Sequence, residues 1–480
     1  MSKVLIRPGR DWERRPDQHK RAGLLYHENL IGDKLLPPED MRQPADSGKQ
    51  PYTITRNRYI SQDFHDREVR GLWSHVWQMA CREEEIPEIG DISVYEIAGL
   101  SFIIVRGEDS TIRAFRNTCK HRGMKLCAYD TSVNEIRCPF HGFTWDLSGK
   151  LVDVPMRWDF PDLNEESTRL SEVQVGVWGG FIFINPDTKA PSLLSFLEVL
   201  PEHFKGHLEH SQKYITAHWR KVLPCNWKLG IEAFIESYHT LQVHPQFTGF
   251  LSDENGQYDV FGRHISRFLL TIGKNTTAIS NPLPEQTVVD EFFAANSLGA
   301  APSIPEGTTA RAFLAEIMRE RYTSLSGQDY SSCSEAELID SNQYSIFPNM
   351  ILWRTLIFPA VYRFRPNGND PHSSIFDLYL LGDIPASGVR PPAAEVQDLG
   401  EISFMDALKD YSVLLGETYH QDYQNLALLQ EGIAGSPDES LQTAQTQEIR
   451  IRHLEKVLDE YLEQYDPESP SSIIKVKQVK

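Results

Sequence analysis

The sequence has few cysteines, no long apolar run and no excess of positive charge. Its 480 residues include six cysteines, too few for a disulfide-stapled scaffold. No window approaches the roughly 18 apolar residues that a membrane helix needs, and the first twenty residues are too polar for a secretory signal. The net charge of −19 disfavours nucleic-acid binding through a broad basic surface. We therefore expect a folded cytoplasmic protein that binds neither membranes nor nucleic acids.

Two of the cysteines stand beside histidines in a pattern typical of metal ligands. Cys119 and His121 form a C-x-H motif, and after sixteen further residues Cys138 and His141 form a C-x-x-H motif. A glycine follows each histidine closely and permits the sharp backbone bend that such a loop needs. Two thiolates and two imidazoles suit either a tetrahedral zinc or a Rieske [2Fe–2S] cluster. One donor of each kind per loop favours the cluster, in which two Cys hold one iron and two His the other.

A second group of metal-binding residue types follows about one hundred residues later. Apolar residues at helical spacing predict a helix over residues 227–241. Glu232, Glu236 and His239 would then lie on one face of this helix. A proline after His244 disfavours helical geometry there, so we expect the helix to end or bulge and to bring His244 beside His239. Two His and one carboxylate form the facial triad of non-haem Fe(II) oxygenases, although a solvent-exposed helix with scattered charges is the other interpretation.

Together the two motifs resemble the large (alpha) subunit of Rieske non-haem iron ring-hydroxylating oxygenases. The matching stretches are Cys119-x-His121-Arg122-Gly123, Cys138-Pro139-Phe140-His141-Gly142, Trp145-Asp146-Leu147-x-Gly149, Asn226-Trp227-Lys228, Glu236-x-Tyr238-His239 and His244-Pro245. The resemblance runs from about Tyr59 to Leu462. It implies an α+β fold, with a small all-β Rieske domain and a larger catalytic domain. In the catalytic domain an antiparallel sheet would pack against helices in a helix-grip, START-like arrangement.

The resemblance also implies which residues hold the two metal centres. The implied ligands of the [2Fe–2S] cluster are Cys119, His121, Cys138 and His141. His239 and His244 would bind a mononuclear Fe(II). The third iron ligand of the family is an Asp in a C-terminal helix with the pattern D-x7-Q-x-G, which Asp422 fits best. Glu417 and Asp410 are the next candidates.

Glu236 departs from the commonest family pattern. Many members have an Asp three residues before the first His ligand, where it bridges to a cluster His of the neighbouring subunit. A Glu stands there in some relatives, including those that demethylate quaternary amines. The implied electron path runs from His141 of one chain through Glu236 and His239 of the next. A further departure is Ala233, where the family often has an Asn.

The function implied by the resemblance is that of a terminal oxygenase. Such a protein uses O₂ and electrons from a separate ferredoxin or flavin reductase to hydroxylate, dihydroxylate or oxidatively demethylate a small, aromatic organic substrate. The implied assembly is a homotrimer, or an α3β3 complex with a small beta subunit. The alternative is a Rieske-type electron-transfer protein without oxygenase activity, in which the second site is vestigial.

The sequence also divides the chain into four segments. We expect an extended arm over residues 1–52, the Rieske domain over 53–185, the catalytic domain over 186–466 and a tail over 467–480. Residues 273–332 are rich in Ser, Thr, Asn, Gly and Pro, which predicts loops that serve as a lid or as a plain surface insertion.

Within the catalytic domain, short apolar runs predict strands and one segment predicts a helix. We expect strands at residues 350–353, 355–358 and 375–380. An amphipathic helix is expected within residues 440–465, where core packing or an oligomer contact is its expected role.

Overall fold

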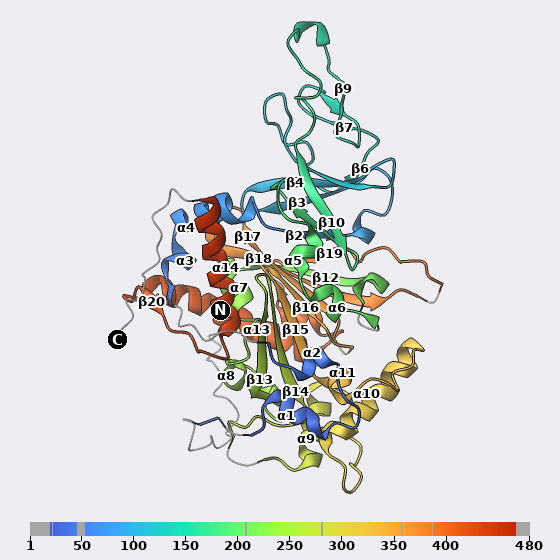
Figure 1. Cartoon of the computed structure of the whole chain (residues 1–480), viewed down its shortest axis with the longest axis vertical. Coiled ribbons are helices and arrows are strands. Elements are labelled where there is room, and N and C mark those ends of the chain that lie inside the picture. The colour runs from blue at the N-terminus through green and yellow to red at the C-terminus, as the bar shows by residue number, and fades with distance from the viewer. Residues whose placement is uncertain are drawn as a thin grey trace.

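Two β-rich parts follow one another along the chain, an upper one and a central one (Figure 1). The computed structural model describes residues 20–21, 23–45, 53–206, 209–279, 282–356, 358–385 and 387–466. The predicted tail over residues 467–480 lies outside these ranges, and so do residues 1–19, 22 and 46–52 of the predicted arm.

The upper part is built from strands, as expected for a Rieske domain. A seven-stranded sheet has the order β2-β11-β10-β5-β4-β3-β6, and a three-stranded sheet, β7-β8-β9, lies above it toward the upper end of the molecule (Figure 1). The strands are β2 (Gln78–Arg82), β3 (Asp91–Ile97), β4 (Leu100–Arg106), β5 (Ile112–Arg116), β6 (Thr131–Ser132), β7 (Ile136–Arg137), β8 (Thr144–Trp145), β9 (Leu151–Asp153), β10 (Glu172–Trp178) and β11 (Phe181–Asn185). All pairs are antiparallel.

The central part contains an eight-stranded sheet of order β13-β14-β15-β16-β17-β18-β12-β19. The strands are β12 (Lys213–Leu223), β13 (Leu251–Phe261), β14 (Ile265–Ile272), β15 (Ser341–Ile346), β16 (Met350–Trp353), β17 (Ala360–Asn367), β18 (Asp370–Asp383) and β19 (Val396–Asp398). The sheet is antiparallel except that β19 pairs parallel with β12. The α+β fold class is thereby confirmed, and so are the predicted strands at residues 350–353 and 375–380.

Helices cover the central sheet and connect its strands. The α-helices of the described part are α1 (Tyr26–Asn29), α2 (Glu39–Arg42), α3 (Asn57–Ile60), α4 (Gln62–Glu68), α5 (Leu193–Leu197), α6 (Leu200–His203), α7 (Trp227–Glu232), α8 (Thr240–Val243), α9 (Glu285–Ala295), α10 (Ala310–Ser326), α11 (Glu335–Ile339), α12 (Phe404–Leu408), α13 (Val413–Gly435) and α14 (Ile449–Tyr465). The helix predicted within residues 440–465 is α14. The start of that predicted range is not helical, because Ser440 and Leu441 form strand β20, which pairs with β1 (Ile54–Thr55).

The structure corrects two predictions of local structure. Thr355, Leu356 and Phe358 do not lie in a strand, because the Thr355 hydroxyl accepts the Phe358 N–H at 3.0 Å and Pro359, which follows, has no N–H for a ladder. Residues 273–332 form loops only in part, since α9 and α10 take up 28 of these 60 residues. The Thr309 hydroxyl caps α10 by accepting the Ala312 N–H at 3.2 Å.

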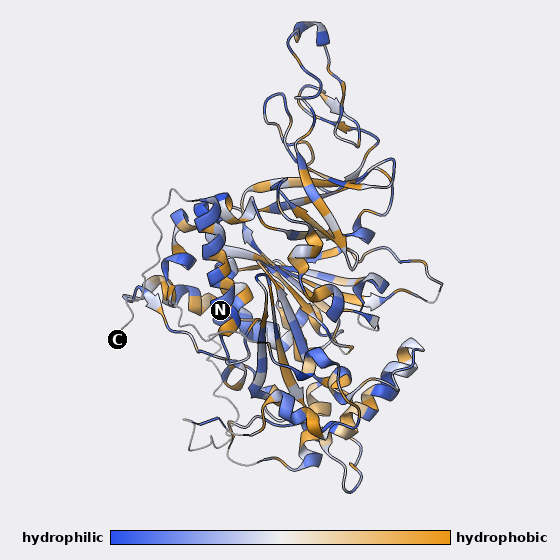
Figure 2. Cartoon of the chain, viewed as in Figure 1, coloured by the Kyte–Doolittle hydropathy of each residue, from blue (hydrophilic) through white to orange (hydrophobic). Residues whose placement is uncertain are grey.

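One apolar core continues from the upper sheet into the central sheet. It includes Ile182 of β11 and Phe364 of β17, both with no exposed surface. Figure 2 shows the hydrophobic colouring gathered on the strands where the two sheets meet. Across this junction Arg365 of β17 donates a hydrogen bond of 2.8 Å to the carbonyl oxygen of Glu96 in β3. The upper part is therefore fixed to the central sheet by both apolar packing and hydrogen bonds.

The described part of the predicted arm is not extended but folds against the central sheet of its own chain. The Asn29 amide of α1 donates to the Thr271 hydroxyl in β14 at 3.3 Å. Arg311 of α10 lies between two carboxylates, with Nε 2.6 Å from Asp33 and Nη2 2.9 Å from Asp340. The buried Arg311 therefore links α10 with the N-terminal segment through Asp33, and with the residue between α11 and β15 through Asp340.

Changing Arg311 to Gln is expected to lower the free energy of unfolding by about 3–5 kcal/mol, because two buried carboxylates lose their counter-charge. Chemical denaturation followed by far-UV circular dichroism measures the change. Lys456→Gln serves as the control, since Lys456 forms an exposed i,i+4 pair with Glu460 at 4.0 Å, and such pairs contribute less than about 1 kcal/mol. Equal effects of the two changes would contradict the role of Arg311.

Candidate metal centres

The two Cys/His loops of the upper part have the same backbone hydrogen-bond pattern. In the first loop the Cys119 N–H donates to the carbonyl oxygen of Met124 at 2.7 Å, and the Gly123 N–H donates to that of Cys119 at 3.0 Å. In the second loop the Cys138 N–H donates to the carbonyl oxygen of Phe143 at 2.8 Å, and the Gly142 N–H donates to that of Cys138 at 3.1 Å. Gly123 and Gly142 have φ values of +77° and +74°, a conformation that favours glycine. The two glycines noted in the sequence therefore shape two equivalent loops.

These loops bring the four predicted cluster ligands together. Cys119 and Cys138 are buried and form no disulfide, and the rings of His121 and His141 lie with centroids 4.7 Å apart. Burial, and after it the neighbouring Cys138 thiol, raises the pKa of Cys119. The backbone N–H of His121 also lies 3.4 Å from the Cys119 Sγ, an interaction that stabilises thiolate character.

The spacing of these donors disfavours a single zinc ion. Donor atoms bound to one zinc at about 2.0–2.3 Å lie within about 4 Å of one another. In the described part of the chain, His239, His244 and Asp422 are the one group of three His, Cys, Asp or Glu donors that meets a 4.8 Å limit. The four loop residues are not such a group, as expected where two metal atoms separate the thiolates from the imidazoles. The donor set therefore fits a [2Fe–2S] cluster.

The helix predicted over residues 227–241 is broken in the middle. Helix α7 ends at Glu232, and α8 begins only at Thr240. Between them the Glu236 carboxylate accepts the backbone N–H groups of Tyr238 and His239, which competes with helical hydrogen bonding. The predicted end before the proline is confirmed, since α8 stops at Val243. The prediction that Glu232, Glu236 and His239 share one face of a helix is therefore wrong, although His239 and His244 still lie close together.

His239, His244 and Asp422 converge on one point in the central part. The Asp422 Oδ1 lies 3.0 Å from His244 Nε2 and 3.8 Å from His239 Nε2. All three offer one donor atom within 4.8 Å of the others. Two neutral imidazoles and a carboxylate on one side of a metal leave further coordination positions open, as in non-haem Fe(II) sites.

Each imidazole also has a hydrogen-bond acceptor on its outer nitrogen. His239 Nδ1 contacts the Glu236 carboxylate, and His244 Nδ1 lies 2.7 Å from Gln421 Oε1. A proton on each Nδ1 leaves each Nε2 lone pair for a metal, which is the usual arrangement of ligand histidines. Burial opposes the charged form of His239, but the Glu236 carboxylate outweighs it and raises the pKa of that ring to about 9, so that a metal which binds Nε2 at neutral pH displaces the second proton of the ring. Glu236 and Gln421 thus orient the rings of His239 and His244 through the Nδ1 atoms that they contact.

Helix α13 supplies Asp422 rather than the other two candidate acids. Asp422 is buried in the middle of this helix, whereas Glu417 is only half-buried and Asp410 is exposed ahead of it. Leu415, Thr418, Tyr419 and Asp422 recur at helical spacing and all face one cavity. The structure therefore supports Asp422 as the third donor at this point.

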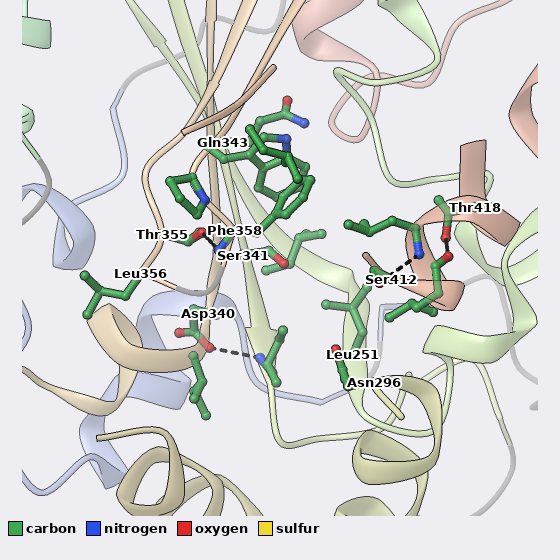
Figure 3. Close-up of a pocket in the computed structure, with 18 of the residues that line it drawn as sticks. Leu251, Asn296, Asp340, Ser341, Gln343, Thr355, Leu356, Phe358, Ser412 and Thr418 are labelled. Atoms are coloured by element: carbon green, nitrogen blue, oxygen red, sulfur yellow. Dashed lines mark hydrogen bonds between the residues drawn. The ribbon is translucent and has the colours of Figure 1, made fainter. Parts of the chain in front are cut away.

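A cavity of about 960 Å³ opens beside the three donors. Its apolar walls combine aliphatic side chains with aromatic ones, which include Phe234, Phe247, Phe268, Phe292, Trp353, Phe358, Tyr362 and Tyr419. Figure 3 shows Gln343, Thr355 and Phe358 on one side and Ser412 and Thr418 on the opposite side, with Leu251 and Asn296 toward the bottom of the view. A cavity of this size and lining suits a small, largely apolar molecule.

Sequence reasoning missed several residues around this cavity. Tyr362 and Tyr419 are buried and their hydroxyl oxygens lie 2.6 Å apart, with Tyr419 one turn before Asp422. No sequence motif marked Gln421, which orients His244, apart from its position next to Asp422. Tyr362 stands in a strand with ordinary alternation, so no pattern could mark it. Within the described ranges, none of the helices combines the length and hydropathy needed to cross a bilayer.

Two family models match the chain in the order that the site geometry suggests. The model described as Rieske [2Fe–2S] domain matches residues 76–163. The model described as ring hydroxylating alpha subunit, catalytic domain, matches residues 207–464, which is more than half of the chain. The first match contains both Cys/His loops, and the second contains all three donors of the central site.

The chain is also similar to curated oxygenase subunits. It is 29% identical over 229 residues to the carnitine monooxygenase oxygenase subunit of Escherichia coli (strain K12), covering 46% of this chain and 58% of that protein. It is 29% identical over 199 residues to the biphenyl 2,3-dioxygenase subunit alpha of Rhodococcus jostii (strain RHA1), covering 40% of this chain and 43% of that protein. The chain spans about half the length of the curated relatives it matches.

Solved structures show the same fold. Naphthalene 1,2-dioxygenase from Rhodococcus sp. bound to indole aligns with a TM-score of 0.59 at 20% identity, covering 90% of this chain and 100% of that one. A quaternary ammonium Rieske monooxygenase in complex with L-carnitine aligns with a TM-score of 0.57 at 17% identity, covering 86% and 96%. Together with the family matches, the two donor sets and their order along the chain show that it belongs to the ring-hydroxylating alpha subunits, with a Rieske [2Fe–2S] domain ahead of the catalytic domain.

Proposed function

We propose that this chain is the terminal oxygenase component of a system with a separate ferredoxin or flavin reductase. It would use O₂ to hydroxylate, dihydroxylate or oxidatively demethylate a small, aromatic organic substrate. The observation that carries the proposal is the convergence of His239, His244 and Asp422 at the wall of an aromatic-lined cavity. An electron carrier with a vestigial second site would have no use for such a cavity.

The proposed ligand roles follow from the donor sets. Cys119, His121, Cys138 and His141 would hold the [2Fe–2S] cluster, and His239, His244 and Asp422 would hold the mononuclear iron. When bound, the cluster supplies single electrons, and the iron supplies the site at which O₂ is reduced and oxygen is transferred to the substrate. We place the boundary between the two domains after residue 185, and we keep residues 1–52 and 467–480 as an arm and a tail.

The remaining residues position these groups and keep water away. Glu236 and Gln421 hold the protons on the Nδ1 atoms of His239 and His244. The aromatic walls would hold a ring against the three donors and exclude bulk water. The Tyr362 and Tyr419 hydroxyl groups are hydrogen-bonded to each other beside the three donors. They can hold a proton close to Asp422.

We further propose a head-to-tail trimer, either alone or with a small beta subunit, in the cytoplasm. His141 is exposed in the loop between β7 and β8, and Phe140 beside it is 58% exposed. Tyr238, between Glu236 and His239, is 62% exposed. Apolar exposure at both places supports their contact between neighbouring subunits, with the electron path from His141 of one chain to Glu236 and His239 of the next.

The purified protein is expected to contain about three Fe and about two acid-labile sulfides per chain, because one [2Fe–2S] cluster and one mononuclear iron are present. Metal analysis, a sulfide assay and the visible spectrum measure this content. In Cys138→Ser the sulfide and two Fe should be lost, whereas Cys127→Ser, a change at a cysteine in neither loop, should retain both. Zinc in place of iron, with no sulfide, would contradict the cluster assignment.

The activity itself is tested by a substrate screen with a surrogate reductase. Product mass distinguishes a gain of one oxygen, a gain of two oxygens and the loss of a methyl group. Reduction of the cluster without oxygenation of any compound, in protein with full iron content, would favour the electron-carrier alternative.

A further inference from the structure

Helix α10 forms the end of the cavity that lies away from the three metal donors. In Figure 1, α10 stands at the lower right, apart from α8 and α13. Its cavity-facing residues recur at helical spacing along one side of the helix, and they are Met318, Arg321, Tyr322, Leu325 and Ser326. This face combines apolar side chains with a guanidinium and a phenol hydroxyl, so it can contact both the body and a polar end of a bound molecule.

Two polar groups of this face, the Arg321 guanidinium and the Tyr322 hydroxyl, form no hydrogen bond or ion pair with the residues that the structure describes. Tyr322 is only 8% exposed, and its hydroxyl makes no hydrogen bond in the described structure. A buried hydroxyl without a partner costs about 1–3 kcal/mol, so a ligand that accepts its proton would recover that cost. Arg321 is exposed at the same end of the cavity, and no ion pair involves it among the described residues. Both groups can therefore donate hydrogen bonds to an acceptor on a bound molecule.

A third donor faces the cavity from β15. Gln343 is 1% exposed, and its Oε1 accepts a hydrogen bond of 3.0 Å from Nη1 of the fully buried Arg450. That bond orients the amide and leaves its Nε2 without a hydrogen bond among the described contacts. Arg450 itself forms no ion pair in the described part of the chain, and it stacks over Phe268, a residue of the cavity wall. The guanidinium of Arg450 therefore lies behind this wall, where the Asp259 carboxylate offsets part of its charge.

The carboxylates of the cavity are all engaged already. Glu236 and Asp422 contact the two ligand histidines. Asp340 binds Arg311, and Asp383 binds Lys213 at 2.6 Å. A cationic ligand would thus find no acid left to pair with, whereas an anionic ligand would find Arg321, the Tyr322 hydroxyl and the Gln343 amide.

We propose that the cavity binds an aromatic acid, whose carboxylate is held at the α10 end by Arg321 and Tyr322 while its ring lies between the aromatic walls. The proposal rests on the proposed function, because the ring must reach the three metal donors to react. A guanidinium pairs with a carboxylate through two parallel hydrogen bonds, which would fix the substrate's orientation as well as its charge. Arg321 and Tyr322 would then determine specificity, and a quaternary ammonium compound would be a poor ligand.

Three probes with one aromatic body and different head groups test the charge preference. Biphenyl-4-carboxylate, biphenyl-4-carboxamide and biphenyl-4-yl-trimethylammonium can be titrated into the anaerobic holoenzyme by isothermal calorimetry. We expect the carboxylate to bind at least about tenfold more tightly than the carboxamide, since charge-assisted hydrogen bonds are the stronger ones, and the ammonium to bind most weakly. Equal affinities, tighter binding of the ammonium, or no binding of any probe would overturn the proposal.

Variants assign the preference to α10. Arg321→Gln should weaken carboxylate binding by about tenfold and carboxamide binding by less than about twofold, and Arg321→Lys should restore only part of the loss, because an ammonium keeps the charge but not the paired hydrogen bonds. Tyr322→Phe should weaken both neutral and anionic probes, and the exposed Lys456→Gln should change neither. An equal loss for all three probes in Arg321→Gln would show a merely structural role and would overturn the proposal. Because binding is measured separately from iron, sulfide and product, its failure is distinguishable from failure of the proposed function.

Discussion

Changing His244 to Ala is expected to remove the mononuclear iron and to lower product formation by more than about hundredfold, while the [2Fe–2S] cluster stays in place. His244 Nε2 lies 3.0 Å from Asp422 Oδ1, at the point where the three donors converge. Changes of the outer hydrogen-bond partners of a metal ligand typically cost 10–100-fold in affinity or activity, and loss of the donor itself costs more. Iron content should fall from about three to about two per chain, with unchanged sulfide.

A matched pair on α13 tests the third ligand in the same way. Asp422→Ala should behave as His244→Ala does, because both remove a donor from the same point. Glu417→Ala changes a half-buried acid on the same helix and should retain iron and product formation. Full iron content in Asp422→Ala together with iron loss in Glu417→Ala would show that the ligand assignment is wrong.

Changing Glu236 to Gln is expected to keep both metal centres and to slow electron delivery to the catalytic site by about 10- to 100-fold. The amide has nearly the same shape and keeps an acceptor for His239 Nδ1, so the ring stays oriented. It lacks the negative charge that raises the pKa of His239 to about 9, even though burial of the ring opposes this. Single-turnover kinetics, followed by the absorbance of the reduced cluster, measure the rate.

Gln421→Ala is the control for this experiment. It removes the corresponding outer partner of the other ligand, His244 Nδ1, at 2.7 Å. It should lower iron affinity but leave the rate of cluster oxidation unchanged in protein with full iron content, because it lies outside the proposed path from His141. Unchanged kinetics in Glu236→Gln, or an equal slowing in both variants, would remove the bridging role of Glu236.

The cluster loops could be predicted almost completely from the sequence because their geometry is local. All the backbone hydrogen bonds that shape each loop join residues four or five apart. The glycines required at positive φ are adjacent to the histidines and visible as letters, Gly123 and Gly142. Residue type and spacing therefore determine such a loop before any tertiary contact forms.

The region of the iron ligands shows where local reasoning fails. Periodicity predicted one helix over residues 227–241, but the Glu236 side chain binds backbone N–H groups and interrupts it. Periodicity counts apolar residues and cannot detect a carboxylate that competes for the backbone. The proline after His244, by contrast, acts on its immediate neighbour, and the end of α8 before it was predicted correctly.

The sequence alone determined the kinds of metal donors, their order along the chain and the α+β class, because these depend on residue identity, short spacings and patterns of two to four residues. Only the tertiary structure showed that Asp422, already the first candidate from its sequence pattern, meets the histidines, that α9 and α10 form within residues 273–332, and that Arg321 and Tyr322 face the cavity. These features arise from the packing of α10 and α13 against a sheet whose strands are distant in sequence. Which face of a helix is buried, and against what, is set by that packing and not by the helix itself.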